Sequence, residues 1–232
     1  ATIAGGVAAA YASLGIDAGH LLTASILSAP GTLVIAKLMF PEMDKSETAD
    51  EECELPKSRA TNSIDALCQG ASDGMRLSIN VIAMLIAFVA LVYMANAILG
   101  WAPSWTAWNF TIQEAVGWLN VPFAWLMSVP SDECVRVGAV LGERVVLNEF
   151  MGYLKLTSMM EGEGALSPRT SAIATYALCG FANFGSVAIQ IGGIGTLAPD
   201  RRADLAKLGL KAMVGGVLAC YLTATVAGLL MP

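Results

Sequence analysis

Apolar residues gather in six stretches that contain no charged side chain, and connectors between them hold all the charges. The stretches are residues 1–16, 18–36, 77–113, 115–131, 170–199 and 212–232. A helix that spans a bilayer needs about 20 consecutive, largely apolar residues. The pattern therefore predicts an all-α polytopic membrane protein, with spans at residues 19–40, 77–100 and 203–231.

Two segments do not fit a simple span. Residues 170–199 carry no charge, but glycine and polar residues around Asn183 interrupt them. This predicts a discontinuous helix, whose unwound middle leaves backbone groups in need of partners. In residues 113–155, charges and prolines interrupt short apolar turns on both sides of a Pro-Ser-Asp sequence at 130–132. Two half-hydrophobic helices around such a turn favour a re-entrant hairpin, which needs protein or a water-filled cavity around it.

The same pattern divides the chain into five parts. They are a broken helix with the helix after it (1–40), an acidic connector with a helix on the membrane surface (41–76), a transmembrane helix with a Trp-rich end (77–112), the hairpin (113–160), and the discontinuous helix with the last span (161–232). All five tryptophans lie within residues 101–125, which is typical of the headgroup region. The chain begins inside an apolar stretch with no basic segment before it, so we expect upstream sequence rather than a signal peptide.

Composition supports the membrane class and excludes others. Only 14% of the residues are charged and 56% are hydrophobic, whereas a soluble chain carries about 25% charged residues. A nucleic-acid-binding protein, a secreted disulfide scaffold and a disordered tail are excluded. The five cysteines are far apart and form no CxxC, and the single histidine, His20, cannot form a histidine-based metal cluster. No Ser-His-Asp set or HExxH motif occurs, so a membrane-embedded enzyme has less support than a transporter and no cofactor is expected.

Two polar residues occupy positions where they are costly. Glu149 lies at an apolar turn of the predicted hairpin, and Asn183 lies in the break of the discontinuous helix. A carboxylate offers two acceptor oxygens, which suits a vicinal diol, and an amide adds one acceptor and two donors. Together with Ser186 they would hold a neutral, sugar-bearing solute. The alternative is that Glu149 pairs with an arginine of the hairpin and Asn183 only satisfies its own broken backbone.

Several runs of residues are similar to the concentrative nucleoside transporter family. The most specific is Tyr176-Ala-Leu-Cys-Gly-Phe-Ala-Asn-Phe-Gly-Ser186, which continues to Ile191-Gly192-Gly193. The others are Ala1-Thr-Ile-Ala-Gly-Gly-Val7, His20-Leu-Leu-Thr-Ala-Ser-Ile-Leu-Ser-Ala-Pro30 and Asn148-Glu149-Phe150. The likeness covers nearly the whole chain in order, and the chain resembles the C-terminal portion of a bacterial-type member.

The resemblance implies a homotrimeric, cation-driven nucleoside importer in the cell inner (plasma) membrane, surrounded by lipid and without a nucleic-acid partner. It implies an inverted-repeat transporter in which a transport domain moves like an elevator against a scaffold, with residues 1–40 in the transport domain and 77–112 in the scaffold. By the same likeness, Glu149, Asn183 and Ser186 match ribose-binding positions, and Phe181 and Val7 match apolar neighbours of the nucleoside. Thr2 and Ile3 match positions of a sodium site, and oxygen ligands suit a hard cation.

The family's first hairpin, which carries the nucleobase motif and the remaining sodium ligands, is not in this sequence. The preference for purines or pyrimidines therefore cannot be read from it, and uridine serves as the example substrate. Thr2 favours sodium as the coupling ion, with a proton-coupled nucleoside transporter as the alternative. A membrane-embedded enzyme or a pore is the alternative from a different class.

Overall fold

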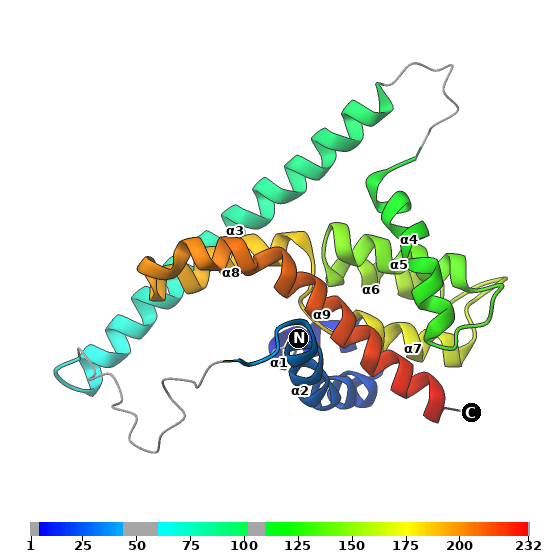
Figure 1. Cartoon of the computed structure of the whole chain (residues 1–232), viewed down its shortest axis with the longest axis horizontal. Helices are drawn as coiled ribbons and strands as arrows, with labels where there is room; N and C mark the ends of the chain where they lie inside the picture. Colours follow the sequence, from blue (N-terminus) through cyan, green and yellow to red (C-terminus); the bar gives the residue numbers. More distant parts are fainter. Residues whose placement is uncertain (1–4, 44–59, 102–109, 232) are drawn as a thin grey trace.

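The computed structural model describes residues 5–43, 60–101 and 110–231, and within them every regular element is helical. This confirms the all-α class. Figure 1 shows the helices in chain order. They are α1 (Gly5–Ser13), α2 (Ala18–Met39), α3 (Ser63–Gly100), α4 (Ile112–Leu126), α5 (Cys134–Val146), α6 (Glu149–Ser158), α7 (Pro168–Leu178), α8 (Phe184–Leu197), the short 3₁₀ turn η1 (Pro199–Arg201) and α9 (Arg202–Leu230).

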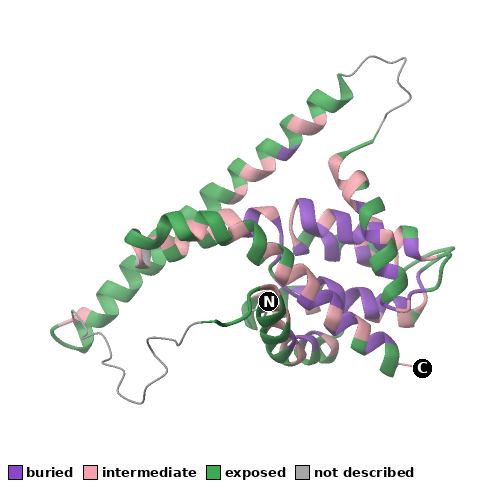
Figure 2. Cartoon of the chain, viewed as in Figure 1, coloured by how far each residue is buried: buried purple, intermediate pink, exposed green. Residues whose placement is uncertain are grey.

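The buried core lies where α5, α6 and α7 meet the C-terminal half of α9, as Figure 2 shows. Leu141, Leu156, Ile173 and Leu178 are fully buried there. Burying each such side chain stabilises a fold by about 1.5–3 kcal/mol. The core thus fixes the ends of the short helices, and these ends carry the polar residues that the sequence points to.

Three described helices, α2, α3 and α9, are long and apolar enough to cross a membrane. They match the three predicted spans, except that α2 and α9 each end one residue earlier than predicted. Helix α3 differs from the prediction in one respect, because it runs without a break from Ser63 to Gly100. Residues 63–76 therefore form the first turns of α3, and residues 60–62 precede it, so they do not form a separate surface helix. The reason is local: Asn62 caps the helix by accepting from the N–H of Asp65 at 2.9 Å, and no proline follows to end it.

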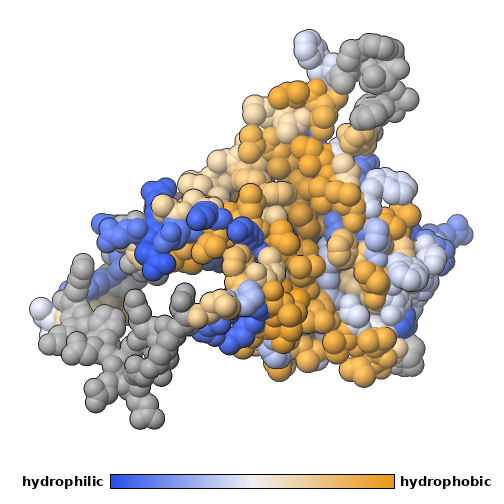
Figure 3. Space-filling model, in the orientation of Figure 1, coloured by the Kyte–Doolittle hydropathy of each residue, from blue (hydrophilic) through white to orange (hydrophobic). Residues whose placement is uncertain are grey.

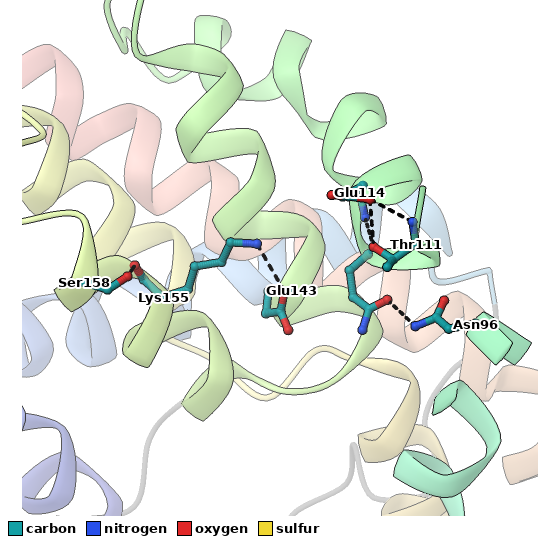
Figure 4. A network of polar contacts seen from close by, with 7 residues as sticks. Asn96, Thr111, Glu114, Glu143, Lys155 and Ser158 are labelled. Atoms are coloured by element: carbon teal, nitrogen blue, oxygen red, sulfur yellow. Dashed lines mark hydrogen bonds and ion pairs between the residues drawn. The ribbon is translucent and has the colours of Figure 1, made fainter. Parts of the chain in front are cut away.

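Helix α3 lies apart from the core and is exposed along most of its length (Figure 2). Apolar side chains cover its surface beyond residue 76, among them Ile79, Ile82 and Ile86 (Figure 3). At its C-terminal end Asn96 joins it to α4, donating from Nδ2 to Oε1 of Gln113 at 2.8 Å and accepting from the N–H of Ile112 at 2.9 Å (Figure 4).

The segment predicted as a two-helix hairpin contains three helices and two turns. The first turn, residues 127–133, includes the expected Pro-Ser-Asp sequence and joins α4 to α5. A second turn at residues 147–148 sends α6 back along α5, and Lys155 of α6 forms an ion pair with Glu143 of α5 at 3.2 Å (Figure 4). Glu149 is therefore the first residue of α6, directly after this second turn. The sequence pattern did not predict the second turn.

The discontinuous helix is confirmed. Helix α7 ends at Leu178 and α8 begins at Phe184, with five residues between them that are not helical. Helix α9 packs against α7, α8 and α2. Gly215 and Gly216 allow these contacts, since a Cβ at Gly215 would lie 3.1 Å from Sδ of Met39 and one at Gly216 would lie 3.0 Å from Cβ of Ala182.

Candidate functional site

The N-termini of α6 and α8 are joined by a buried hydrogen bond between Asn183 and Glu149. Asn148 caps α6 by accepting from the N–H of Met151 at 2.9 Å, and Asn183 caps α8 by accepting from the N–H of Ser186 at 2.7 Å. Both asparagines have extended backbones, as N-cap residues require. The turn between α5 and α6 and the break between α7 and α8 are thus anchored by the same device.

Glu149 and Asn183 join the turn to the break. Nδ2 of Asn183 donates to Oε2 of Glu149 at 2.9 Å, and the hydroxyl of Tyr11 in α1 donates to Oε1 at 3.2 Å. Glu149 is 5% exposed, and the other two residues are buried as well. A carboxylate removed from water needs such donors. Three segments that are far apart in the sequence therefore meet at one carboxylate.

Ser186 orients Asn183. Its hydroxyl accepts from the N–H of Asn183 at 3.0 Å and lies 2.7 Å from the carbonyl oxygen of Asn183, to which it donates. With the bond from the Ser186 N–H to the amide oxygen of Asn183, this forms a reciprocal capping box. The amide oxygen is committed to the cap, so the NH₂ group of Asn183 is turned toward Glu149.

The contacts of this polar pair bear on both interpretations. Asn183 does satisfy its broken backbone, but it also reaches Glu149. Among the residues that the structure describes, no ion pair joins Glu149 to an arginine. The hydrogen bonds to Glu149 come from the neutral donors Tyr11 and Asn183, while the charge of Arg144 in α5 acts on it from beyond ion-pair distance. The Glu149 oxygens retain lone pairs for further donors.

The other predicted residues lie around this pair or outside the described part. Phe181, in the break, is 38% exposed and lines a cavity of about 660 Å³ together with Ser186. The cavity lies between α2, α8 and the first half of α9, and its volume falls within the roughly 300–1,000 Å³ of ligand pockets. Val7 packs against the core from α1, one turn before Tyr11. Thr2 and Ile3 lie outside the described residues.

Two residues of the site were missed from the sequence. Tyr11 appears there as one aromatic side chain in an Ala-rich helix, and nothing local relates it to Glu149. Arg144 is fully buried, and its Nη2 donates to the carbonyl oxygen of Gly180 in the break at 3.2 Å and to Sγ of Cys220 at 3.1 Å. Arg144 lies one helical turn after Val140, on the buried face of α5, and this spacing could have predicted its burial.

The polar groups of the site suit binding rather than bond cleavage. They offer acceptor oxygens and amide donors, and Ser186, which holds Asn183, also lines the apolar cavity. No group of three or more His, Cys, Asp or Glu residues that could hold a metal ion occurs in the described part of the chain.

Known proteins share this arrangement of helices and motifs. A family model described as the C-terminus of Na⁺-dependent nucleoside transporters matches residues 20–228. Solute carrier family 28 member 3 of Eptatretus stoutii is 43% identical over 99% of this chain and 36% of its own length. Nucleoside permease NupC of Helicobacter pylori is 38% identical over 99% of this chain and 55% of its own length. The chain therefore spans about a third to just over half of these relatives.

Solved structures of CNTnw are similar over the whole fold. A variant in an outward-facing state is 42% identical with a TM-score of 0.85, covering 99% of this chain and 55% of that one. An inward-facing, substrate-bound state is also 42% identical, with a TM-score of 0.78 over 98% of this chain and 54% of that one.

Proposed function

The chain belongs to the Na⁺-dependent nucleoside transporter family, and we propose that it forms the ribose-binding part of a cation-coupled nucleoside importer. It is a multi-pass membrane protein, and its relatives are transporters rather than enzymes. The observation that carries the proposal is the buried pair of Glu149 and Asn183, which joins the turn before α6 to the break before α8 at 2.9 Å.

The chemistry of this pair supports a sugar ligand. Each oxygen of Glu149 accepts one hydrogen bond from the protein and keeps a lone pair for a hydroxyl of ribose. Ser186 holds Asn183 in position, and Phe181 offers an apolar face at the adjoining cavity. Val7 is the further apolar residue that we assign to the nucleoside. Neutral nucleosides such as uridine match a site that combines one carboxylate with apolar walls.

Sodium is the coupling ion in this proposal, with Thr2 and Ile3 supplying oxygen ligands. We propose an elevator-type movement within a homotrimer in a lipid bilayer. The family name supports sodium as the coupling ion, and the outward-facing and inward-facing states of CNTnw support a movement between two states. Proton coupling is the alternative for the ion.

Uptake of labelled uridine into vesicles that contain the full-length protein tests the proposal. We expect accumulation of unmodified uridine above the outside concentration when an inward sodium gradient is applied at fixed pH. Replacing sodium by choline should abolish this accumulation. Equilibration without accumulation would indicate a pore, and accumulation that follows pH but ignores sodium would indicate proton coupling.

The substitution Glu149→Gln tests the site. We expect it to weaken uridine uptake about tenfold or more, because a charge-assisted hydrogen bond contributes about 1.5–3 kcal/mol. Glu143→Gln is the matched control, since Glu143 is a carboxylate of the same hairpin that pairs with Lys155 away from the site. Equal uptake by the Glu149 variant and the control, at equal protein levels, would overturn the assignment.

A further inference from the structure

Tyr11 lies fully buried at the carboxylate of Glu149, and neither the sequence pattern nor the family likeness assigns it a role. Its hydroxyl donates to Oε1 of Glu149 at 3.2 Å, across 138 positions of the sequence. From this contact we propose that Tyr11 positions the Glu149 carboxylate for recognition of the sugar hydroxyls, and thereby sets how strongly a ribose is preferred over a deoxyribose. The inference rests on the proposed function, because it assigns a determinant of the same site.

The two oxygens of the Glu149 carboxylate have different donors. Asn183 donates to Oε2 at 2.9 Å and Tyr11 donates to Oε1, so the carboxylate is held from both sides. A carboxylate held by one donor alone can rotate about its terminal torsion, which is broad in glutamate. Two donors from different segments, α1 and the break before α8, fix this rotation. The remaining lone pairs then point in a direction that does not depend on the ligand.

Tyr11 is itself held by a cluster of aromatic rings. Its ring packs at a tilt of 36° against the ring of Tyr153 in α6, with centroids 4.3 Å apart, and lies near Phe150 at 6.4 Å. The hydroxyl of Tyr153 donates to the backbone carbonyl of Thr175 in α7 at 3.0 Å. The Tyr153 ring, which Tyr153→Phe would keep, makes the contact with Tyr11, and the packing of these rings holds the Tyr11 hydroxyl against Glu149. The carboxylate is oriented by the packed core rather than by solvent.

A carboxylate oriented in advance is selective for the sugar. It discriminates strongly between a ligand with the matching hydroxyl and one without it, since the latter leaves a buried acceptor unpaired. Without the Tyr11 hydroxyl, the Glu149 carboxylate can rotate so that Oε1 meets a different donor. The difference in binding free energy between the ligand with the hydroxyl and the ligand without it then becomes smaller. Tyr11 therefore affects the ratio between sugars more than it affects folding.

The test compares Tyr11→Phe with Tyr153→Phe in the full-length transporter. Each substitution removes one buried hydroxyl from the same cluster of aromatic rings, but only the Tyr11 hydroxyl bonds to Glu149. KM is measured for uridine and for 3′-deoxyuridine and 2′-deoxyuridine. For Tyr11→Phe we expect the uridine KM to rise about tenfold or more, which corresponds to the loss of one hydrogen bond to a charged group. The ratio of the KM for either deoxy compound to that for uridine should fall toward one.

For Tyr153→Phe the ratio should stay at the wild-type value, even if the transport rate falls, since a packing defect lowers uptake of all three nucleosides alike. An unchanged ratio in Tyr11→Phe would overturn the inference while the proposed function stands. Failure of the unmodified protein to take up any nucleoside would instead refute the proposed function. The double variant Tyr11→Phe, Glu149→Gln adds a second measurement: its loss should equal that of Glu149→Gln alone, and a fully additive loss would contradict the inference.

Discussion

Arg144 is the largest of the fully buried side chains and carries a charge into the core. Its Nη2 donates to the carbonyl of Gly180 and to Sγ of Cys220, and its guanidinium lies 5.9 Å from the centroid of the Tyr221 ring. Its Nε and Nη1 make no hydrogen bond to any described residue. Arg144 thus ties α5 to both the helix break and α9, at the cost of keeping a charge away from water.

We predict that Arg144→Met lowers the stability of the protein by about 1.5–3 kcal/mol, because the break loses a charged hydrogen-bond donor. Arg144→Lys, which keeps the charge and one donor, should recover part of the loss. Thermal unfolding of the purified protein in detergent measures both. An unchanged melting temperature in Arg144→Met would show that the packing of the break does not depend on this contact.

The position of Arg144 also shows where residue-level prediction from sequence ends. Glu149 and Asn183 stand out in the sequence because each is polar where the surroundings are apolar. Arg144 follows Glu143 in a segment with several charges, and the charge suggests exposure, although its spacing from Val140 places it on the buried face. Tyr11 could not be found at all, since its contact with Glu149 spans more than half of the chain and leaves no local pattern.

At the scale of elements, α4 and α5 approach each other closely at glycines. A Cβ at Gly142 would collide with the carbonyl oxygen of Gln113, and one at Gly138 would lie 2.8 Å from the carbonyl oxygen of Gly117. Small residues at such contacts let the backbones of membrane helices pack directly. We therefore predict that Gly142→Ala forces the two helices apart and destabilises the protein by about 1–3 kcal/mol.

Gly74→Ala is the matched control for this change. Gly74 is also a helical glycine, but a Cβ there would meet no atom within 4 Å. Alanine favours a helix by about 1 kcal/mol over glycine, so this variant should be no less stable than the parent. The difference between the two melting temperatures isolates the contact between α4 and α5, and equal melting temperatures would contradict the predicted collision.

Elements were predicted where the sequence contains a signal that stops a helix. Glycines and Asn183 indicate the break after α7, and Pro130 indicates the turn after α4. The turn between α5 and α6 has no glycine or proline, and only Asn148 as an N-cap indicates it. The boundary expected at residue 76 is absent, because no residue there stops the helix. A change from polar to apolar side chains alters the surroundings of a helix but does not end it.

At the scale of the whole molecule, α3 lies outside the core and contacts the rest of the chain mainly along α8 (Figure 1). The contact includes apolar side chains, with the rings of Phe88 and Phe184 6.2 Å apart and a Cβ at Gly193 only 3.1 Å from Leu77. An elevator-type movement requires the transport domain to slide along a fixed scaffold. If α3 belongs to the scaffold, as the family resemblance implies for residues 77–112, this contact has to change during each cycle.

We predict that linking α3 to α8 stops transport. In a background without exposed native cysteines, Leu77→Cys and Gly193→Cys are joined by a short thiol-reactive linker that reducing agent cleaves. Uridine uptake should fall to background and return on reduction, while each single variant keeps its uptake. Joining Glu143→Cys to Lys155→Cys within the hairpin is the control, because both residues lie in one compact unit. Undiminished uptake by the linked Leu77 and Gly193 variant would mean that α3 and α8 move as one body, which would contradict the division into scaffold and transport domain.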